Sequence, residues 1–392
     1  MKKSLLALAV LGAFSSAAFA QSSVQLYGII DLGVAHYSNG NGSVSKLGTG
    51  IQSGSRIGLK GTEDLGGGLS AFFDAETGFC ANGGNGTANT SNVGPYCTGG
   101  PGGQGFMGRQ AFAGLKGNFG AVSFGRQYTL TFLDQANIDP FGYGLTGTIS
   151  NIGTILAPPR ASQSIIYQSP NFDGFNVAGM YVFGDGLGYT TGLGASTVTY
   201  PAGSTLNGVL TTQPTTLVTP GQTATQTTGA YNLHAGYNNG PIMVGLDYLR
   251  MNAATGNPLF KHTMIVGSYD FGVAKLAGMY AQNQQGNAAG VTGDKLNVWM
   301  LGATVPVGPG ALLASYTVQQ DKTTAGKGAK QYAIGYTYSL SKRTNLYTSY
   351  AHISNDTGAN FTVQDATGNN DAPVVGTGFT SSGFALGIRH QF

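Results

Sequence analysis

Three arginines lie in segments where apolar and polar residues alternate, and they are the strongest candidates for functional side chains in this chain. A guanidinium stays charged at physiological pH and presents rigid N–H donors to carboxylates and phosphates. Successive residues of a strand point to opposite faces, and this spacing puts Arg56, Arg109 and Arg160 on the polar side of their segments. We therefore expect the three side chains to line one wall of an aqueous space. Three further basic residues meet the same test at less central positions: Lys60, Lys275 and Arg389.

The residue types that catalysis or metal binding requires are scattered along the sequence. Each of the five histidines is separated from the others and from both cysteines: His36, His234, His262, His352 and His390. Gly100, Gly102 and Gly105 fit G-x-G-x-x-G, but no predicted strand precedes them and no helix follows, so we do not interpret them as a dinucleotide site. We predict no enzyme, no cofactor and no metal site. An outer-membrane barrel enzyme remains a distant alternative.

The segments that hold the arginines are predicted strands with one large apolar face. In residues 331–340, Tyr332, Ile334, Tyr336, Tyr338 and Leu340 alternate strictly with small or polar residues. About 16 segments of this kind recur from residue 24 to the end, and short turns alternate with long connections. An even strand number with that alternation is typical of bacterial outer-membrane barrels. We predict an all-β fold, a transmembrane antiparallel up-and-down β-barrel.

The N-terminal residues have the features of an export signal. Lys2 and Lys3 precede an apolar stretch at 5–14, and Ala18-Phe19-Ala20 is a small-x-small cleavage pattern. The apolar run is shorter than the roughly 20 residues that a membrane-spanning helix needs. We therefore expect a cleaved signal peptide at 1–20 and a single barrel domain at 21–392.

The charge balance argues against a nucleic-acid partner. Without Lys2 and Lys3, 17 of the 19 basic residues remain against 16 acidic ones, which leaves a net charge of +1. Nucleic-acid binding favours clustered basic residues with a sizeable positive total. Charged residues make up only 9% of the chain, whereas 65 residues are glycine, which suits strands and turns better than disorder.

Three loop regions carry further expectations. The connection at about 128–160 is long enough to fold inward, which would set Asp134 and Asp139 opposite the arginines; an ordinary outer loop with solvated acids is the alternative. The Thr-, Gly- and Pro-rich tract at about 184–228 is expected to be a long flexible outer loop. Cys80 and Cys97 flank a small polar segment and are candidates for a disulfide, with two free thiols as the alternative.

Several motifs together resemble the general trimeric porins of Gram-negative bacteria, most closely the neisserial and beta-proteobacterial branch. The resemblance covers the whole mature chain. It rests on the following segments: Val24-Gln25-Leu26-Tyr27-Gly28, Ser55-Arg56-Ile57-Gly58-Leu59-Lys60-Gly61, 108–117, Gly125-Arg126-Gln127-Tyr128 and Gly387-Ile388-Arg389-His390-Gln391-Phe392.

The resemblance implies a 16-stranded barrel, a homotrimer, and a third outer loop folded into each pore. It makes Arg56, Arg109 and Arg160 the basic wall of the constriction, and Asp134 and Asp139 its acidic side. Enterobacterial relatives carry a glutamate between the proline and phenylalanine of this loop. Here Pro140 and Phe141 are adjacent, which favours a basic-dominated, anion-preferring pore.

The resemblance also implies partners and a location. Arg126 would contribute to the trimer contact, with snorkelling to the membrane interface as the alternative. Phe392 would be the signal read by the barrel-assembly machinery, and the barrel would lie in outer-membrane lipid and lipopolysaccharide. The expected function is passive diffusion of small hydrophilic solutes and ions through the outer membrane, with mild anion preference. A substrate-specific anion channel of the same fold is the nearest alternative, and an adhesin is a more distant one.

Overall fold

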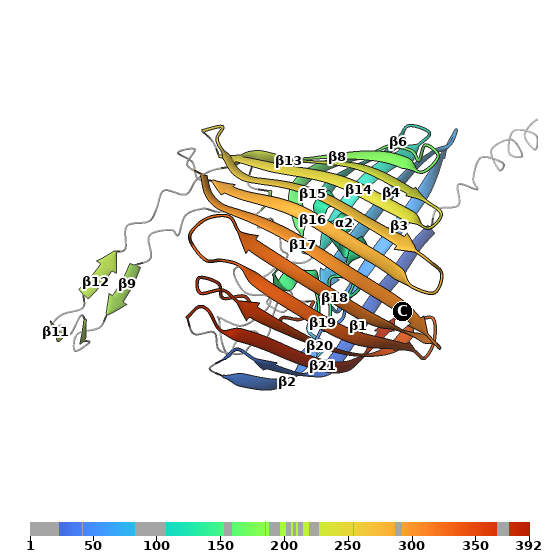
Figure 1. Cartoon of the computed structure of the whole chain (residues 1–392). Coiled ribbons are helices and arrows are strands. Elements are labelled where there is room, and N and C mark those ends of the chain that lie inside the picture. The colour runs from blue at the N-terminus through green and yellow to red at the C-terminus, as the bar shows by residue number, and fades with distance from the viewer. Residues whose placement is uncertain are drawn as a thin grey trace, which may run out of the picture.

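A single closed antiparallel barrel dominates the computed structural model (Figure 1). The structure describes residues 23–40, 42–82, 107–152, 159–184, 186–187, 197–200, 205–206, 209–210, 215–218, 227–253, 255–286, 292–366 and 376–392. The expected signal peptide at 1–20 lies outside the described residues. No described helix is long and apolar enough to cross a membrane.

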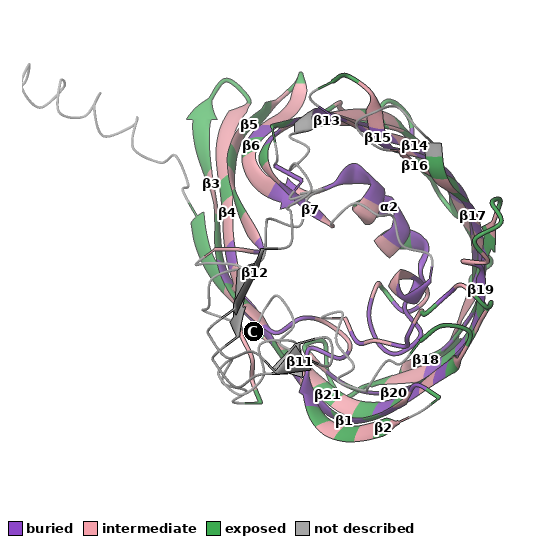
Figure 2. Ribbon diagram, turned by 90° about the vertical axis from the view of Figure 1, so that its left-hand side faces the viewer, coloured by how far each residue is buried: buried purple, intermediate pink, exposed green. Residues whose placement is uncertain are grey.

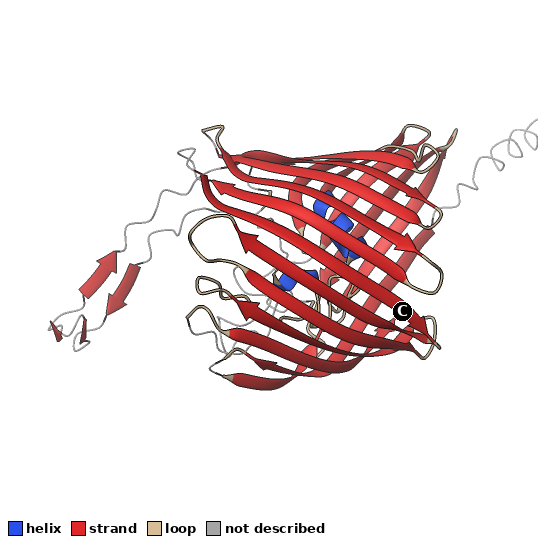
Figure 3. Ribbon diagram, in the orientation of Figure 1, coloured by secondary structure: helices blue, strands red, loops and turns tan. Residues whose placement is uncertain are grey.

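Seventeen strands join into the barrel sheet, and Figure 3 shows that almost all of the wall is strand. Neighbours in the chain pair antiparallel, and β21 pairs with residues 29–38 of β1 to close the ring. The strands are β1 (Ser23–Ser38), β2 (Ser43–Thr49), β3 (Arg56–Gly66), β4 (Leu69–Gly78), β5 (Gln110–Gly117), β6 (Gly120–Tyr128), β7 (Arg160–Gln168), β8 (Phe175–Phe183), β13 (Thr227–Asn239), β14 (Ile242–Ala253), β15 (Pro258–Asp270), β16 (Lys275–Gly286), β17 (Thr292–Val307), β18 (Gly310–Asp321), β19 (Ala329–Ser339), β20 (Thr344–Asn355) and β21 (Thr380–Gln391).

Two of these strands share one position in the barrel. β2 pairs with residues 32–38 of β1, and β3 pairs with residues 23–29 of the same strand. They act as one barrel strand that is interrupted at residues 50–55. The seventeen strands therefore occupy 16 positions, which confirms the predicted barrel and its strand number.

The wall follows the alternation seen in the sequence. On β19, Tyr332 and Ile334 are 52% and 58% exposed, whereas Gln331 and Ala333 on the other face are 0% and 6% exposed. Large apolar side chains point outward around the barrel, an arrangement that burial in hydrocarbon explains and that a water-soluble protein avoids. At the tight turn between β17 and β18, Gly308 adopts φ +58°, a conformation that glycine accepts most readily.

Part of the connection between β6 and β7 lies inside the ring of strands (Figure 2). It contains the helix α2 (Leu130–Ile138), which Thr129 caps by accepting from the Phe132 N–H, and the 3-10 helix η1 (Ile149–Asn151). Ile138 and Ile149 pack in one cluster with apolar side chains of β15, β16 and β17. Phe141 and Leu145 pack in another with Tyr37, Tyr347 and Ala351 of β1 and β20. Residues 129–152, which we call the inner segment, thus contact well-separated parts of the inner wall.

The tract at 184–228 contains short strands that the sequence patterns did not predict. β9 (Thr197–Tyr200) pairs with β12 (Thr215–Val218), and β10 (Thr205–Leu206) pairs with β11 (Val209–Leu210). Threonine and valine are frequent in these pairs, and both residues favour extended backbone. Figure 1 shows this hairpin beyond one end of the barrel.

Candidate functional site

The three predicted arginines lie together on the barrel wall and share two partners. Arg56 Nε is 3.2 Å from Glu76 Oε2, and Arg109 Nε is 2.5 Å from Glu76 Oε1. Arg109 and Arg160 each donate through Nη2 to the Tyr128 hydroxyl, at 3.0 and 2.8 Å. We call Arg56, Arg109, Arg160, Glu76 and Tyr128 the arginine cluster.

Burial differs within the arginine cluster. Arg109 and Arg160 are each 4% exposed, whereas the side chain of Arg56 is 22% exposed and is the most accessible guanidinium of the three. The Arg160 guanidinium lies 4.4 Å from the centroid of the Tyr128 ring, a cation–π contact. The Tyr128 ring also stacks on Phe132 of α2, with ring centroids 4.6 Å apart. The arginine cluster is therefore adjacent to the segment that enters the barrel.

Strand register explains how residues distant in sequence meet here. Arg56 begins β3 opposite Gly78 of β4, and Glu76 lies two residues earlier on β4, on the same face. Glu76 is paired with Gln110 at the start of β5, next to Arg109. The Arg109 N–H also donates to the Glu76 carbonyl at 3.1 Å, which fixes its backbone.

Positive charge exceeds negative charge around this cluster. The Tyr27 hydroxyl lies 2.7 Å from Asp74 Oδ1 and 3.2 Å from Glu76 Oε2, and Lys60 Nζ lies 5.1 Å from the Tyr27 ring centroid. Three arginines and Lys60 thus stand against Glu76 and Asp74, a net charge of +2 from those six groups. Anions are the solutes that such a surface attracts.

The two aspartates expected to face the arginines make other contacts in the structure. Asp134 Oδ2 pairs with His234 Nδ1 of β13 at 2.8 Å. Asp139 is 6% exposed and accepts the N–H groups of Phe141, Tyr143 and Ile149 at 3.0, 3.1 and 3.0 Å. Among the described residues, neither carboxylate forms an ion pair with an arginine.

The helix accounts for this difference from the expectation. α2 directs Asp134 toward β13 and places Asp139 at its C-terminal end, where the carboxylate organises the turn that follows. Burial raises the pKa of Asp139 to about 6, while its three backbone hydrogen bonds act in the opposite direction.

The remaining basic candidates lie at different places on the wall. Lys275 Nζ is 3.4 Å from the Asn137 carbonyl of α2, so it reaches the inner segment. Arg389 donates to Asn345 Oδ1 at 3.0 Å and to Ser53 Oγ at 3.1 Å. Lys60 is exposed and contacts Tyr27 as described above.

The remaining predicted residues make their contacts within the chain. Arg126 donates to the Gly108 carbonyl at 2.6 Å and to Ser162 Oγ at 2.8 Å, both within the chain. Phe392 exchanges two backbone hydrogen bonds of 3.1 Å with Gly28 and so extends the closing strand pair. Cys80 is disulfide-bonded, and Cys97 lies outside the described residues.

Sequence reasoning missed Glu76 and Tyr128, which join the arginines. The alternation of residues along the strand could have identified Glu76. It lies between Ala75 and Thr77, so its side chain falls on the opposite face of the segment from theirs. Sequence reasoning also missed a group formed by Asp134, His234 and Asp247, since register and helix docking bring those residues together.

Comparisons with known proteins agree with this architecture. The sequence profile of the Gram-negative porin family matches residues 7–358. Outer membrane porin protein 32 of Delftia acidovorans is 35% identical over the full length of both chains. Major outer membrane protein P.IB of Neisseria gonorrhoeae is 35% identical over 48% of this chain and 50% of its own.

Solved structures include one with close overall similarity. The anion-selective porin from Comamonas acidovorans has a TM-score of 0.70 and 29% identity, and the match covers 95% of this chain and 100% of that one. The profile spans most of the sequence and the Delftia relative spans all of it. The chain therefore belongs to the Gram-negative porin family, in its beta-proteobacterial and neisserial branch, and is an outer-membrane protein.

Proposed function

We propose that this porin forms a water-filled channel that prefers anions, and that residues 129–152 narrow it beside the arginine cluster. The observation that carries the proposal is the gathering of three arginines, because Arg56 and Arg109 pair with Glu76 while Arg109 and Arg160 share the Tyr128 hydroxyl. Small hydrophilic solutes and ions would pass by diffusion, without a catalysed step.

The electrostatics support selectivity of moderate strength. Glu76 neutralises part of the arginine charge, and the two aspartates of the inner segment are engaged by His234 and by backbone N–H groups. The excess positive charge is screened by salt, with a Debye length of about 10 Å at 0.1 M and about 3 Å at 1 M. Anion preference should therefore weaken as the salt concentration rises.

The similarity to the Comamonas protein, which is described as anion-selective, points the same way. The proposal includes a homotrimer, because the family resemblance implies one. It also includes contacts with lipopolysaccharide and recognition of Phe392 by the barrel-assembly machinery. Arg126 is proposed to contribute to the trimer contact.

Charge substitutions in the cluster test the selectivity. Arg56→Gln removes the most accessible guanidinium, and Glu76→Gln removes the shared carboxylate, so the two changes should shift the reversal potential in opposite directions. The measurement is the zero-current potential of single channels in a potassium chloride gradient across a planar bilayer. Lys342→Gln, at an exposed turn between β19 and β20, is the matched control for a lost charge.

Two results would overturn the assignment. One is a reversal potential that Arg56→Gln leaves unchanged while the barrel stays folded. The other is a shift for Lys342→Gln as large as that for Arg56→Gln, which would mean that the cluster has no special influence on ions in the pore.

A further inference from the structure

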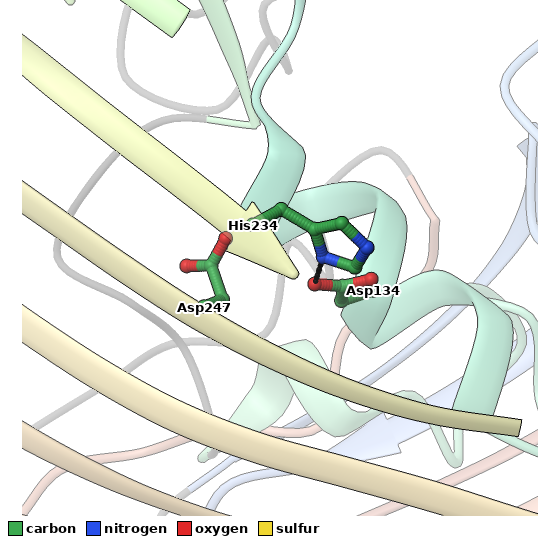
Figure 4. Close-up of side chains that lie close together, drawn as sticks. All are labelled: Asp134, His234 and Asp247. Carbon is green, nitrogen blue, oxygen red and sulfur yellow. Dashed lines mark hydrogen bonds and ion pairs between the residues drawn. The ribbon is translucent and has the colours of Figure 1, made fainter. Parts of the chain in front are cut away.

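A histidine and two aspartates from three different elements converge on the inner side of the barrel (Figure 4). Asp134 lies on α2, His234 on β13 and Asp247 on β14. One ligand atom from each residue lies within 4.8 Å of the other two. Nitrogen and carboxylate oxygen donors in this combination are those that first-row transition cations accept.

Strand register and helix docking both position the group. His234 and Asp247 are direct partners across β13 and β14, so their side chains stand side by side on one face. Thr131, one turn before Asp134, donates through its hydroxyl to Asp247, and its N–H donates to Asn232 Oδ1 at 3.1 Å. Asn232 Nδ2 holds the second Asp247 oxygen at 2.8 Å.

The group holds two buried carboxyl groups and a single imidazole. Asp134 and Asp247 are 7% and 3% exposed. Among the described residues, neither forms an ion pair with a lysine or arginine, and His234 is the one basic group paired with Asp134. A buried charge without a partner is costly, so two adjacent carboxylates favour a cation between them.

A cavity gives access to two of the three residues. Its volume is about 360 Å³, and its lining includes Asp134 and His234. Asn137, Asn171 and Asn176 also line it and supply polar groups to a hydrated ion. The cavity lies between α2 and the wall formed by β7, β8 and β13.

We propose that Asp134, His234 and Asp247 bind one divalent transition cation, zinc or a chemically similar ion, with water completing the coordination. Ligands about 2.1 Å from a tetrahedral zinc are roughly 3.4 Å apart, so small side-chain rotations would suffice to close the group around an ion. His234 Nδ1, which now faces Asp134, would become the nitrogen ligand. Thr131 and Asn232 would orient Asp247 as outer partners.

Binding would join the inner segment to the wall. Asp134 belongs to α2, whereas the other two ligands belong to adjacent barrel strands. A bound cation would therefore fix α2 against β13 and β14 and reduce the motion of the segment proposed to narrow the pore. This inference is independent of anion preference, because it concerns a different set of residues.

The test is calorimetric titration of the detergent-solubilised full chain, treated first with a chelator, with zinc chloride. We expect one saturable site per chain. His234→Gln should abolish it, and Asn232→Ala should weaken it by about 10- to 100-fold, the usual effect of removing an outer partner. His352→Gln is the matched control. His352 stacks on Tyr332 at the outer face of the barrel, so this variant should bind zinc as the wild type does.

A second measurement uses the wild-type chain alone, so that it does not depend on how the variants fold. One equivalent of Cu²⁺ should give an electron paramagnetic resonance spectrum with hyperfine coupling to one nitrogen. The proposal is overturned if the wild type shows no saturable zinc site, if folded His234→Gln binds equally well, or if the copper spectrum shows oxygen ligands only. Equal binding by His234→Gln, or a copper spectrum with oxygen ligands only, would indicate adventitious binding. The absence of a saturable zinc site would indicate that protons alone neutralise the carboxylates.

Discussion

Replacing Asp139 should release the inner segment from the barrel wall. Its carboxylate accepts three backbone N–H groups, those of Phe141, Tyr143 and Ile149, and the residue is 6% exposed. Asp139→Ala leaves these donors without their acceptor. A buried unsatisfied donor costs about 1–3 kcal/mol, and the Phe141 and Ile149 N–H groups are buried while that of Tyr143 is partly buried, so the docked segment should lose on the order of 3 kcal/mol.

This energy translates into a measurable change in amide exchange. A loss of about 3 kcal/mol raises the population of the undocked state roughly 100-fold, because 1.4 kcal/mol corresponds to a factor of ten. Hydrogen–deuterium exchange followed by mass spectrometry should show protection of peptides within 139–152 falling by about that factor. Peptides from the barrel strands should keep their protection, since local opening need not unfold the sheet.

The chain offers a control with the same bonding pattern at the surface. Asp321 accepts the Thr323 N–H at 2.7 Å and the Lys327 N–H at 2.9 Å, but there water can replace the carboxylate. Asp321→Ala should therefore have little effect on exchange elsewhere and none on 139–152. Unchanged protection of 139–152 in Asp139→Ala, with the barrel intact, would refute the idea that this carboxylate anchors the segment.

Three further predictions concern the closing strand, the subunit contact and pH. Gly28→Val should slow assembly and lower the temperature at which the heat-modifiable barrel band is lost, because a Cβ there would collide with the Phe392 ring and lie 2.7 Å from the Arg56 carbonyl oxygen. Gly267→Ala, with its nearest neighbour at 3.5 Å, should have neither effect. Arg126→Ala should lower the trimer melting temperature on semi-native gels, and an unchanged value would remove that residue from the proposed contact. Because the folded pKa of Asp139 is about 6 and the ordinary value is 3.8, docking binds a proton between these values. Proton binding by Asp139 should therefore strengthen docking of the inner segment below about pH 4, and this added stability should be lost as pH rises through 6. Hydrogen exchange of residues 139–152, corrected for intrinsic rates, should show this pH dependence. Asp139→Asn should remove the pH dependence.

The wall of the barrel could be predicted because each strand follows a local rule. In β19 and β21, alternating residues belong to lipid-facing and inward faces, and no distant contact is needed to recognise this pattern. The same parity placed Arg56 on the inner side, where it meets Glu76. Arg109 was assigned to that side as well, but it precedes β5 and shares the parity of the exposed Ala111 and Leu115, so its contact with Glu76 depends on the bend before the strand and not on alternation.

The inner segment could not be predicted in the same way. Its helix is only nine residues long, and its direction depends on contacts with β13 and β14, which lie about 100 residues further along the chain. Parity has no meaning within such a segment, so the sequence did not show that Asp134 turns toward His234 or that Asp139 folds onto its own backbone. The break between β2 and β3 was missed for a similar reason, because Asp31 holds residues 52 and 53 through tertiary hydrogen bonds.

The most direct test of an anion-preferring channel is the zero-current potential of the wild-type protein in a planar bilayer. A gradient of potassium chloride, kept near or below 0.1 M to limit screening, should give the sign that corresponds to chloride crossing more readily than potassium. The magnitude should fall when both solutions are raised toward 1 M. A potential of the opposite sign at low salt would contradict the role assigned to the arginine cluster.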